Sequence, residues 1–265
     1  MRAPIMYRIV NVYAAQGFAG NPVAVITDSV DPTLMQQIAR QLNCTATVFV
    51  RQTGPGAYSA RMFSPKFEAA YGGAGSLGAV WAMGEGRWTQ TTSGAVVETE
   101  YRDGHGYTTQ PEPKVEMIPR DGLARAIGLR TIEGAYLGEA GGAHHLVVVT
   151  KDEPGGFAPD SSRLADIAAR HRRCTIGAFR LGGDGTIHGR VFAPAQGVDE
   201  DPACAGGAGI VARVMQCNGT AGESFLIREG EEIGRPSRIE VVASAGAIRV
   251  GGPITLAADG RLHLG

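Results

Sequence analysis

The sequence predicts an α+β protein with two similar half-domains, each a β-sheet wrapped around a central helix, and two observations lead to this prediction. The tetrapeptide Gly-Gly-Ala-Gly occurs twice, at 72–75 and at 206–209, and an apolar segment follows each copy. The match extends upstream, where Arg61-Met62-Phe63-Ser64-Pro65 corresponds to Arg190-Val191-Phe192-Ala193-Pro194 if the second copy contains about five inserted residues. A duplicated strand–turn–helix unit indicates related half-domains, which we expect at 1–120 and 121–265.

The first half shows alternating segments that predict strands and one strongly amphipathic segment that predicts a helix. Asp31 and Pro32 suit the start of this helix, since Asp caps helix N-termini and Pro is tolerated in the first turn. Its apolar residues at 34, 35, 38, 39 and 42 fall on one face. The strands expected in this half lie near 7–13, 23–26, 48–50, 58–63, 94–101 and 106–109.

The second half repeats this mixture of strands and helices. A helix is expected near 161–170, and the second glycine-rich helix near 204–215, with Asp201 as its N-cap and Pro202 in its first turn. The strands expected here lie near 145–149, 187–192, 238–243, 247–250 and 261–264.

Composition narrows the class of protein. The chain has 265 residues, of which 43% are hydrophobic and 19% charged, so it can bury a sizeable core. A net charge of −1 gives no electrostatic reason to expect nucleic acid or an anionic membrane as partner. We expect a cytoplasmic protein with reduced cysteines, because the start lacks a secretory apolar segment and the four cysteines lack zinc or scaffold spacing.

The duplicated helix starts could bind an anion. A helix N-terminus presents unpaired N–H groups and the positive end of the helix dipole, and small residues let a ligand approach the backbone. The same donors would stabilise the charge that develops on a carboxylate when a neighbouring C–H bond loses its proton. Asp201 and Cys204 lie beside the second helix start, and a cysteine there is expected to have a lowered pKa and to act as a base.

A structural interpretation stays open beside this one, because Gly-Gly-Ala-Gly also lets a helix pack tightly against a sheet. The pattern is not a dinucleotide loop, since the GxGxxG spacing and the acidic residue about 20 positions later are missing. The sequence gives no reason to expect a metal or a cofactor.

Several stretches resemble the PhzF-like isomerases of the diaminopimelate epimerase superfamily. The resemblance runs in order through nearly the whole chain and is most specific in its first and last segments. The segments are 18–25, 35–40, 43–50, Glu200-Asp201-Pro202-Ala203 and Gly234-Arg235-Pro236-Ser237. The resemblance implies a diaminopimelate epimerase-like fold with the active site in a cleft between the half-domains, and a cofactor-free proton shift on a small carboxylic acid. It also implies a homodimer.

The departures from the family pattern fall on polar positions. Ala46 stands where the family usually has the glutamate that moves the proton, and Ala74 where it has a histidine. Asp201 matches the usual aspartate, whereas Cys204 replaces a threonine and Gly206 a serine. We therefore expect Asp201 and Cys204 to be catalytic. The expected substrate-binding residues are Thr45, Ala46, Tyr71, Gly72, Gly73, Ala74, Gly75, Ser76, Gly206 and Gly207.

For the other candidate residues we expect a structural role before a catalytic one. Tyr71 is expected to line the pocket, and it or Glu68 could assist a proton transfer. Cys44 is expected to be a core thiol, and Cys174 and Cys217 are read as structural. The pair His144-His145 precedes an apolar strand, where a supporting or structural role is favoured over catalysis.

The sequence thus favours an isomerase that shifts a proton or a double bond in a small carboxylic or amino acid, in the biosynthesis of an antibiotic precursor. Two alternatives stay open. One is a binding protein that holds a carboxylate without turning it over, which the losses at Ala46, Ala74 and Gly206 suggest. The other is an epimerase or racemase that depends on Cys204.

Overall fold

The computed structural model describes residues 3–140, 142–172, 174–220 and 222–263, and it divides the chain into two compact units. The first unit comprises residues 1–109 and 251–265, and the second comprises 110–250. The chain passes from one unit to the other within strand β8 (His105–Pro111) and again within strand β17 (Ala247–Leu262).

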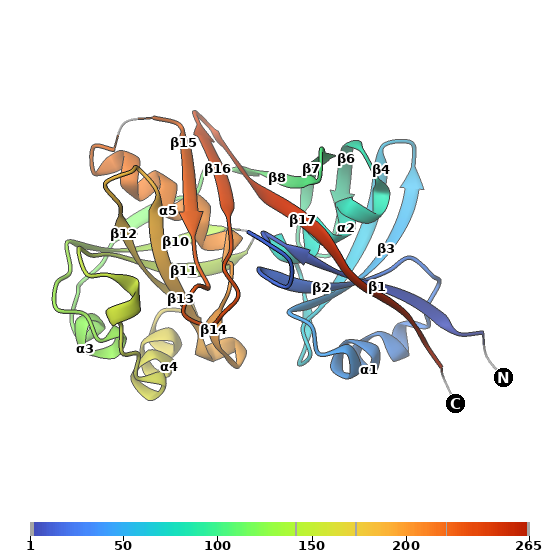
Figure 1. Ribbon diagram of the computed structural model, residues 1–265, viewed down its shortest axis with the longest axis horizontal. Coiled ribbons are helices and arrows are strands. Elements are labelled where there is room, and N and C mark those ends of the chain that lie inside the picture. Colours follow the sequence, from blue (N-terminus) through green and yellow to red (C-terminus); the bar gives the residue numbers. More distant parts are fainter. Residues whose placement is uncertain (1–2, 141, 173, 221, 264–265) are drawn as a thin grey trace. The chain divides into compact units, whose positions relative to one another are not determined.

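In the first unit a twisted sheet curls around helix α2 (Gly73–Met83), which packs against the neighbouring strands (Figure 1). Helix α1 (Pro32–Leu42) packs its buried face against β3 and β4. The remaining strands are β1 (Ile5–Val12), β2 (Asn21–Ile26), β3 (Ala46–Gly54), β4 (Ala57–Phe63), β5 (Glu68–Ala69), β6 (Gly86–Thr91) and β7 (Val96–Arg102).

In the second unit the sheet curls around helix α5 (Ala205–Cys217), while helices α3 (Leu123–Ile127) and α4 (Ser161–Arg170) contribute to a separate apolar cluster. Short 3₁₀ turns occur at Pro154–Gly156 and Pro194–Gln196. The strands are β9 (Val115–Met117), β10 (Gly134–Ala140), β11 (Ala143–Val149), β12 (Thr175–Leu181), β13 (Ile187–Ala193), β14 (Val198–Asp201), β15 (Ser224–Arg228) and β16 (Ile239–Ser244).

The order of strand pairing is the same in both units. In the first, β2 pairs parallel with β3, β3 antiparallel with β4, and β4 parallel with β6. In the second, β11 pairs parallel with β12, β12 antiparallel with β13, and β13 parallel with β15. Helices α1 and α4 occupy the first parallel crossover of their units, and α2 and α5 the second. The predicted α+β fold of two similar sheets around central helices is confirmed.

The bounds of the units differ from the contiguous division at 120/121 expected from the sequence. Strand β17 is much longer than the segment expected at 247–250, and its last residues pair with β1. In that ladder Val12 lies opposite Ile254 and Ile5 opposite Leu262. The end of the chain therefore belongs to the first unit. Leu264, in the last expected strand, lies outside the described residues.

The sequence repeat corresponds to a repeated ion pair. In the first unit Arg61 donates two hydrogen bonds to Glu68, of 2.7 and 2.8 Å. In the second unit Arg190 donates two to Glu200, of 3.0 and 2.7 Å. Each arginine joins the strand before the turn to the short strand after it, and each also lies over the phenylalanine two residues on. The second pair is the buried one, with its side chains 11% and 8% exposed against 41% and 36% for the first.

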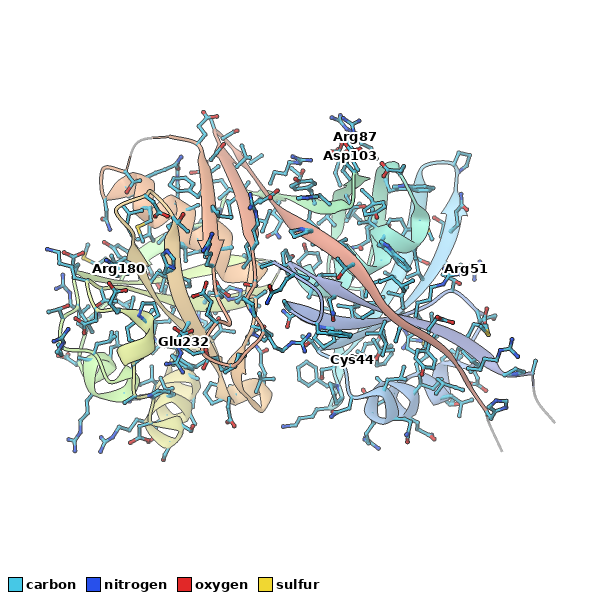
Figure 2. All side chains as sticks on the ribbon, viewed as in Figure 1. Cys44, Arg51, Arg87, Asp103, Arg180 and Glu232 are labelled. Carbon is cyan, nitrogen blue, oxygen red and sulfur yellow. The ribbon has the colours of Figure 1, made fainter. Side chains whose placement is uncertain are left out.

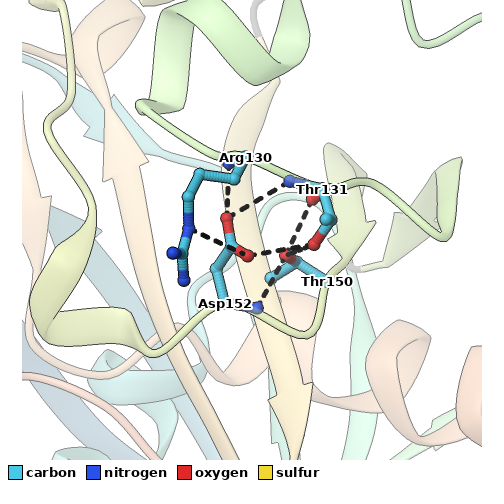
Figure 3. A network of polar contacts seen from close by, with 4 residues as sticks. All are labelled: Arg130, Thr131, Thr150 and Asp152. Carbon is cyan, nitrogen blue, oxygen red and sulfur yellow. Dashed lines mark hydrogen bonds and ion pairs between the residues drawn. The ribbon is translucent and has the colours of Figure 1, made fainter.

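Several elements have no clear signal in the sequence, among them β10, β12 and β15. The segment that precedes β10 is held by a polar network between residues distant in the sequence (Figure 3). Asp152 accepts hydrogen bonds from the backbone N–H groups of Arg130 and Thr131 and from the Thr131 hydroxyl, while the Thr150 hydroxyl donates to the Thr131 carbonyl over 2.8 Å. The bonds from the Arg130 N–H and from Thr131 hold the pKa of the Asp152 carboxyl below its usual value. These partners are about 20 residues apart, so a local pattern cannot reveal them.

None of the helices in the described ranges is both long and apolar enough to cross a membrane.

The two ion pairs form a matched pair for a stability test. We expect Arg190→Met to lower the free energy of unfolding by about 3 kcal/mol or more, because it leaves the buried Glu200 carboxylate without its partner. Arg61→Met should cost less than about 1 kcal/mol, since its pair is exposed to water. Urea denaturation followed by circular dichroism compares the two variants, and equal losses would contradict this assignment.

Candidate active site at the start of helix α5

The start of α5 differs from the one expected. The helix begins at Ala205 with Cys204 as its N-cap, and no side chain caps it. The placement of Asp201 at the N-cap and Pro202 in the first turn is wrong, because Asp201 still pairs with Val191 in the β13–β14 ladder. The Asp201 carboxylate instead accepts a hydrogen bond of 3.1 Å from the Ala203 N–H. This places a half-buried carboxylate directly before the helix.

Cys204 is buried within a group of polar side chains. Its sulfur lies 3.7 Å from Nδ1 of His145 and 3.9 Å from the Thr175 hydroxyl, and its backbone N–H donates a 2.7 Å hydrogen bond to Glu229. The thiol is therefore enclosed by groups from β11, β12 and the end of β15. Asp201 and Cys204, which are near in sequence, are also near in the fold, as the sequence predicts.

The expected lowering of the Cys204 pKa is wrong. Burial raises the pKa of this thiol well above its usual value, and the neighbouring carboxyl groups of Asp201 and Glu229 add to the effect. The Gly207 N–H and the Thr175 hydroxyl act in the opposite direction but are weaker. The loss of water around the sulfur disfavours the thiolate more than the helix N-terminus favours it. Cys204 is therefore a protonated thiol at neutral pH and a poor general base.

Glu229 is the main residue that the sequence analysis did not find. It lies just after β15, it is 1% exposed, and one carboxyl oxygen accepts from the Cys204 N–H while the other has no partner among the described residues. Burial raises the pKa of Glu229 to about 8, an effect that the Cys204 N–H opposes and the charge of Asp201 reinforces. A protonated carboxyl at neutral pH avoids placing a second negative charge beside Asp201.

His145 completes this group. It is 5% exposed, and Nδ1 lies 2.7 Å from the Thr175 hydroxyl, whereas Nε2 has no hydrogen-bond partner in the part of the chain that the structure describes. Burial lowers the pKa of His145 to about 4, with His144 adding to the effect and the Ala140 carbonyl opposing it. The imidazole is therefore neutral at pH 7.

Gly206 and Gly207, both predicted to bind substrate, lie against these groups. A Cβ built on Gly206 would be 2.6 Å from Nε2 of His145, and one on Gly207 would be 3.4 Å from the Cys204 sulfur. Gly206 is half-buried, whereas Cys204, Ala205 and Gly207 are buried. The first turn of α5 is thus least covered at Gly206.

At the start of α2 the predicted residues divide into two groups. Tyr71, Gly72, Gly73 and Ala74 are half-buried, with Gly72 as an N-cap that has no side-chain bond. Gly75 packs on the sheet, since a Cβ there would lie 2.9 Å from Met62. Part of the glycine-rich turn therefore allows α2 to pack closely on the sheet, which is the alternative to ligand binding that the sequence left open.

Ser76 is placed differently from the prediction. It is 0% exposed; its hydroxyl donates to the Gly72 carbonyl and accepts a 2.9 Å hydrogen bond from Gln90, which in turn accepts from Tyr58. This network holds α2 to the sheet and occupies the hydroxyl. The arrangement indicates that Ser76 is part of the interior rather than a substrate contact.

The other first-unit candidates show no acid–base group at the vacant glutamate position. Thr45 is exposed and donates to Asn21, and Ala46 is half-buried. Glu68 is held by Arg61, whose hydrogen bonds lower the pKa of that carboxyl, so it is not poised to carry a proton near neutral pH. Cys44 is 6% exposed and donates to the Leu42 carbonyl, as a core thiol would (Figure 2).

Cys174 is buried, and burial raises the pKa of its thiol to about 11, while Cys217 is exposed at the end of α5. Within the described ranges no group of three or more His, Cys, Asp or Glu side chains is arranged to hold a metal ion.

Comparison with known proteins places the chain among isomerases. A family model described as phenazine biosynthesis-like protein matches residues 10–258. The trans-2,3-dihydro-3-hydroxyanthranilate isomerase of Pseudomonas fluorescens is 31% identical over 248 residues, which is 87% of each chain. The isomerase of the same name from Pseudomonas aeruginosa is 30% identical over 280 residues, 97% of this chain and 99% of that one.

Solved structures agree on the fold. A phenazine biosynthesis protein of the PhzF family from Enterococcus faecalis has a TM-score of 0.85 at 23% identity, over 99% of this chain and 100% of that one. A hydroxyproline epimerase from Agrobacterium vitis, with bound trans-4-hydroxy-L-proline, has a TM-score of 0.64 at 14% identity, over 98% and 93%. The epimerase-like fold implied by the sequence is confirmed.

The raised pKa of Glu229 predicts a pH-dependent effect on stability. The folded protein holds this proton up to about pH 8, whereas an unfolded glutamate loses it near pH 4.3. Burial of Glu229 therefore adds no pH-dependent cost below the unfolded pKa and destabilises the fold increasingly as pH rises toward 8. We expect Glu229→Gln to stabilise the protein by a margin that grows by up to about 1.4 kcal/mol per pH unit between pH 5 and 8 and then levels off.

The measurement is urea denaturation at several pH values, with the exposed Glu232→Gln as the matched control (Figure 2). A margin for Glu229→Gln that does not change with pH would show that Glu229 is ionised in the folded protein.

The buried Cys204 thiol predicts slow alkylation. With iodoacetamide at pH 7.5 under native conditions, we expect the exposed Cys217 to react about as fast as a free thiol and Cys204 more than about 100-fold more slowly. Peptide mass spectrometry over time separates the two sites, and comparable rates would indicate an accessible Cys204 thiolate.

Proposed function

This chain belongs to the phenazine biosynthesis-like (PhzF-like) family of isomerases, and we propose that it shifts a proton or a double bond in a small carboxylic or amino acid without a cofactor. The observation that carries the proposal is the position of Asp201, a half-buried carboxylate directly before the uncapped start of α5. A carboxylate base and a helix N-terminus are the two parts that such a reaction needs side by side.

The reaction follows from these two parts. The substrate carboxylate accepts hydrogen bonds from backbone N–H groups of the first turn of α5, where Gly206 carries no side chain. Asp201 takes a proton from a carbon near that carboxylate, and the electron pair of the broken C–H bond moves into the conjugated system. The proton then returns to a different carbon, so the double bond moves and no redox partner is required. The N–H groups stabilise the charge that gathers on the carboxylate oxygens.

The relatives indicate the class of substrate. Two of them are named for a cyclic unsaturated amino acid, trans-2,3-dihydro-3-hydroxyanthranilate. We infer that this chain also acts on a small unsaturated ring that carries a carboxylate. The absence of a side-chain acid or base at Ala46 and Ala74 favours a substrate different from that of the relatives. We further propose a role in the biosynthesis of an antibiotic precursor, in the cytoplasm, by a homodimer.

One observation favours a second candidate function, a protein that binds a carboxylate without turning it over. Ala46, Ala74 and Gly206 carry no group that could return the proton. A Cys204-dependent racemase is less well supported, because burial raises the pKa of the thiol and makes it a poor base.

Hydrogen exchange in heavy water tests the proposal. The protein is incubated with a panel of small cyclic unsaturated carboxylic acids, and NMR detects deuterium at carbon. We expect exchange into at least one compound and a rate about 100- to 10,000-fold lower in Asp201→Asn, because the base is lost. The exposed Asp199→Asn, in the same strand, should exchange like wild type.

The alternatives give different results. Exchange that survives in Asp201→Asn but is lost in Cys204→Ser, with inversion at one carbon, would indicate the racemase. A compound that raises the melting temperature yet exchanges no hydrogen in any variant would establish the binding protein and exclude the isomerase.

A further inference from the structure

The start of α5 contains a hydrogen-bonding group that the proposed proton transfer does not use, the imidazole of His145. It comes from the middle of the second unit's sheet, on β11, and it reaches the helix start because position 206 is glycine. A Cβ on Gly206 would lie 2.6 Å from Nε2 and 2.7 Å from Cε1 of the ring. The edge of the ring therefore occupies the place that a side chain at 206 would need, and Nε2 lies against the first turn of α5.

Nε2 is a buried polar atom without a partner in the described ranges. Buried polar atoms are nearly always hydrogen-bonded, so one that lacks a partner at a helix N-terminus calls for a ligand. Gly206 is half-buried between buried neighbours, so it is the point of this turn that a ligand can approach, and the covered Nε2 lies next to it. The unpartnered Nε2 and the least covered residue of the turn, Gly206, thus lie side by side.

The groups around Nδ1 decide what Nε2 can do. The Thr175 hydroxyl lies 2.7 Å and the Cys204 sulfur 3.7 Å from Nδ1, and each of these groups has a proton to donate. The sulfur also accepts from the Gly207 N–H, which leaves its own proton free for Nδ1 or for Thr175. Two donors that converge on Nδ1 favour it as the acceptor. In a neutral imidazole the proton is then on Nε2, which becomes a donor.

We propose that the Nε2–H of His145 donates a hydrogen bond to the substrate carboxylate at the start of α5, and that Thr175 and Cys204 set the tautomer that makes this possible. This inference rests on the proposed function for the identity of the ligand as a carboxylate. A neutral imidazole beside a helix N-terminus can polarise an oxygen without itself giving up a proton. His145 thereby adds a side-chain donor to the backbone N–H groups, and Cys204 acts through His145 rather than as a base.

The tautomer is measured directly on the full-length protein. A long-range ¹H–¹⁵N NMR spectrum is recorded on ¹⁵N-histidine-labelled protein at pH 7. The imidazole signals of His145 are identified as those that disappear in His145→Leu. We expect a neutral ring with its proton on Nε2, and a mixture of tautomers in Thr175→Val, because one of the two donors to Nδ1 is gone. A proton on Nδ1 in the wild type would overturn the proposal.

Ligand binding and exchange complete the test. With 2-aminobenzoate as the probe, we expect the Nε2 signal of His145 to shift during titration while that of the neighbouring His144 stays in place. His145→Leu should reduce the rate of carbon–deuterium exchange by about 100-fold, as expected when one oxyanion donor is removed. His145→Gln, which keeps an N–H donor but cannot accept a proton, should retain activity within about 10-fold of wild type, as should the control His144→Gln.

The outcomes separate this inference from the proposed function. Equal exchange in wild type and His145→Leu would overturn the role of His145 and leave the isomerase in place. Loss of exchange in His145→Gln as complete as in His145→Leu would show that the ring is a base and not a donor. Absence of exchange in the wild type would overturn the proposed isomerase activity. The tautomer of His145 and the response of its Nε2 signal to 2-aminobenzoate would then still test the role of His145.

Discussion

The close approach of each central helix to its sheet is the constraint on which the structure depends. In the first unit a Cβ on Gly78 would lie 2.6 Å from Val23, and in the second a Cβ on Gly209 would lie 3.2 Å from Ile248. A side chain at 78 would displace the strand residue beside it, and one at 209 would be a tight contact, because packed interiors have no spare volume. The glycines that allow the packing also leave the first turn of each helix without bulky side chains, so packing and ligand access have the same origin.

The same closeness explains the character of the site in the second unit. The side chains of His145 and Glu229 fill the space around the start of α5, where water cannot solvate a charge. Burial therefore keeps the Cys204 thiol protonated, the imidazole neutral and the Glu229 carboxyl protonated near neutral pH, because the pKa of each group moves toward its uncharged form. Three buried polar groups of the site are thus neutral hydrogen-bond partners, and they add no charge to that of Asp201.

The two units retain the same scaffold while their helix starts have diverged. Each keeps the arginine–glutamate pair that joins the strand before the turn to the strand after it, and each keeps the same order of strand pairing. In the register of the repeat Gly206 corresponds to Gly72, yet Gly72 is the N-cap of α2 whereas α5 already begins at Ala205. Helix α5 therefore begins two residues earlier in the repeat than α2, which brings Cys204 to the helix start, beside polar side chains from distant strands.

The sequence by itself determined the duplicated α+β architecture, most helices and strands, and the adjacency of Asp201 and Cys204, because these depend on repeats and on periodicities within a few residues of chain. Only the tertiary structure decided the chemistry of the site. The partners of Cys204 lie 25, 29 and 59 residues away, at Glu229, Thr175 and His145. A helix start lowers the pKa of a thiol when the thiol is solvated, but burial among distant strands has the larger and opposite effect. That burial is a property of the fold, so no local pattern could reveal it.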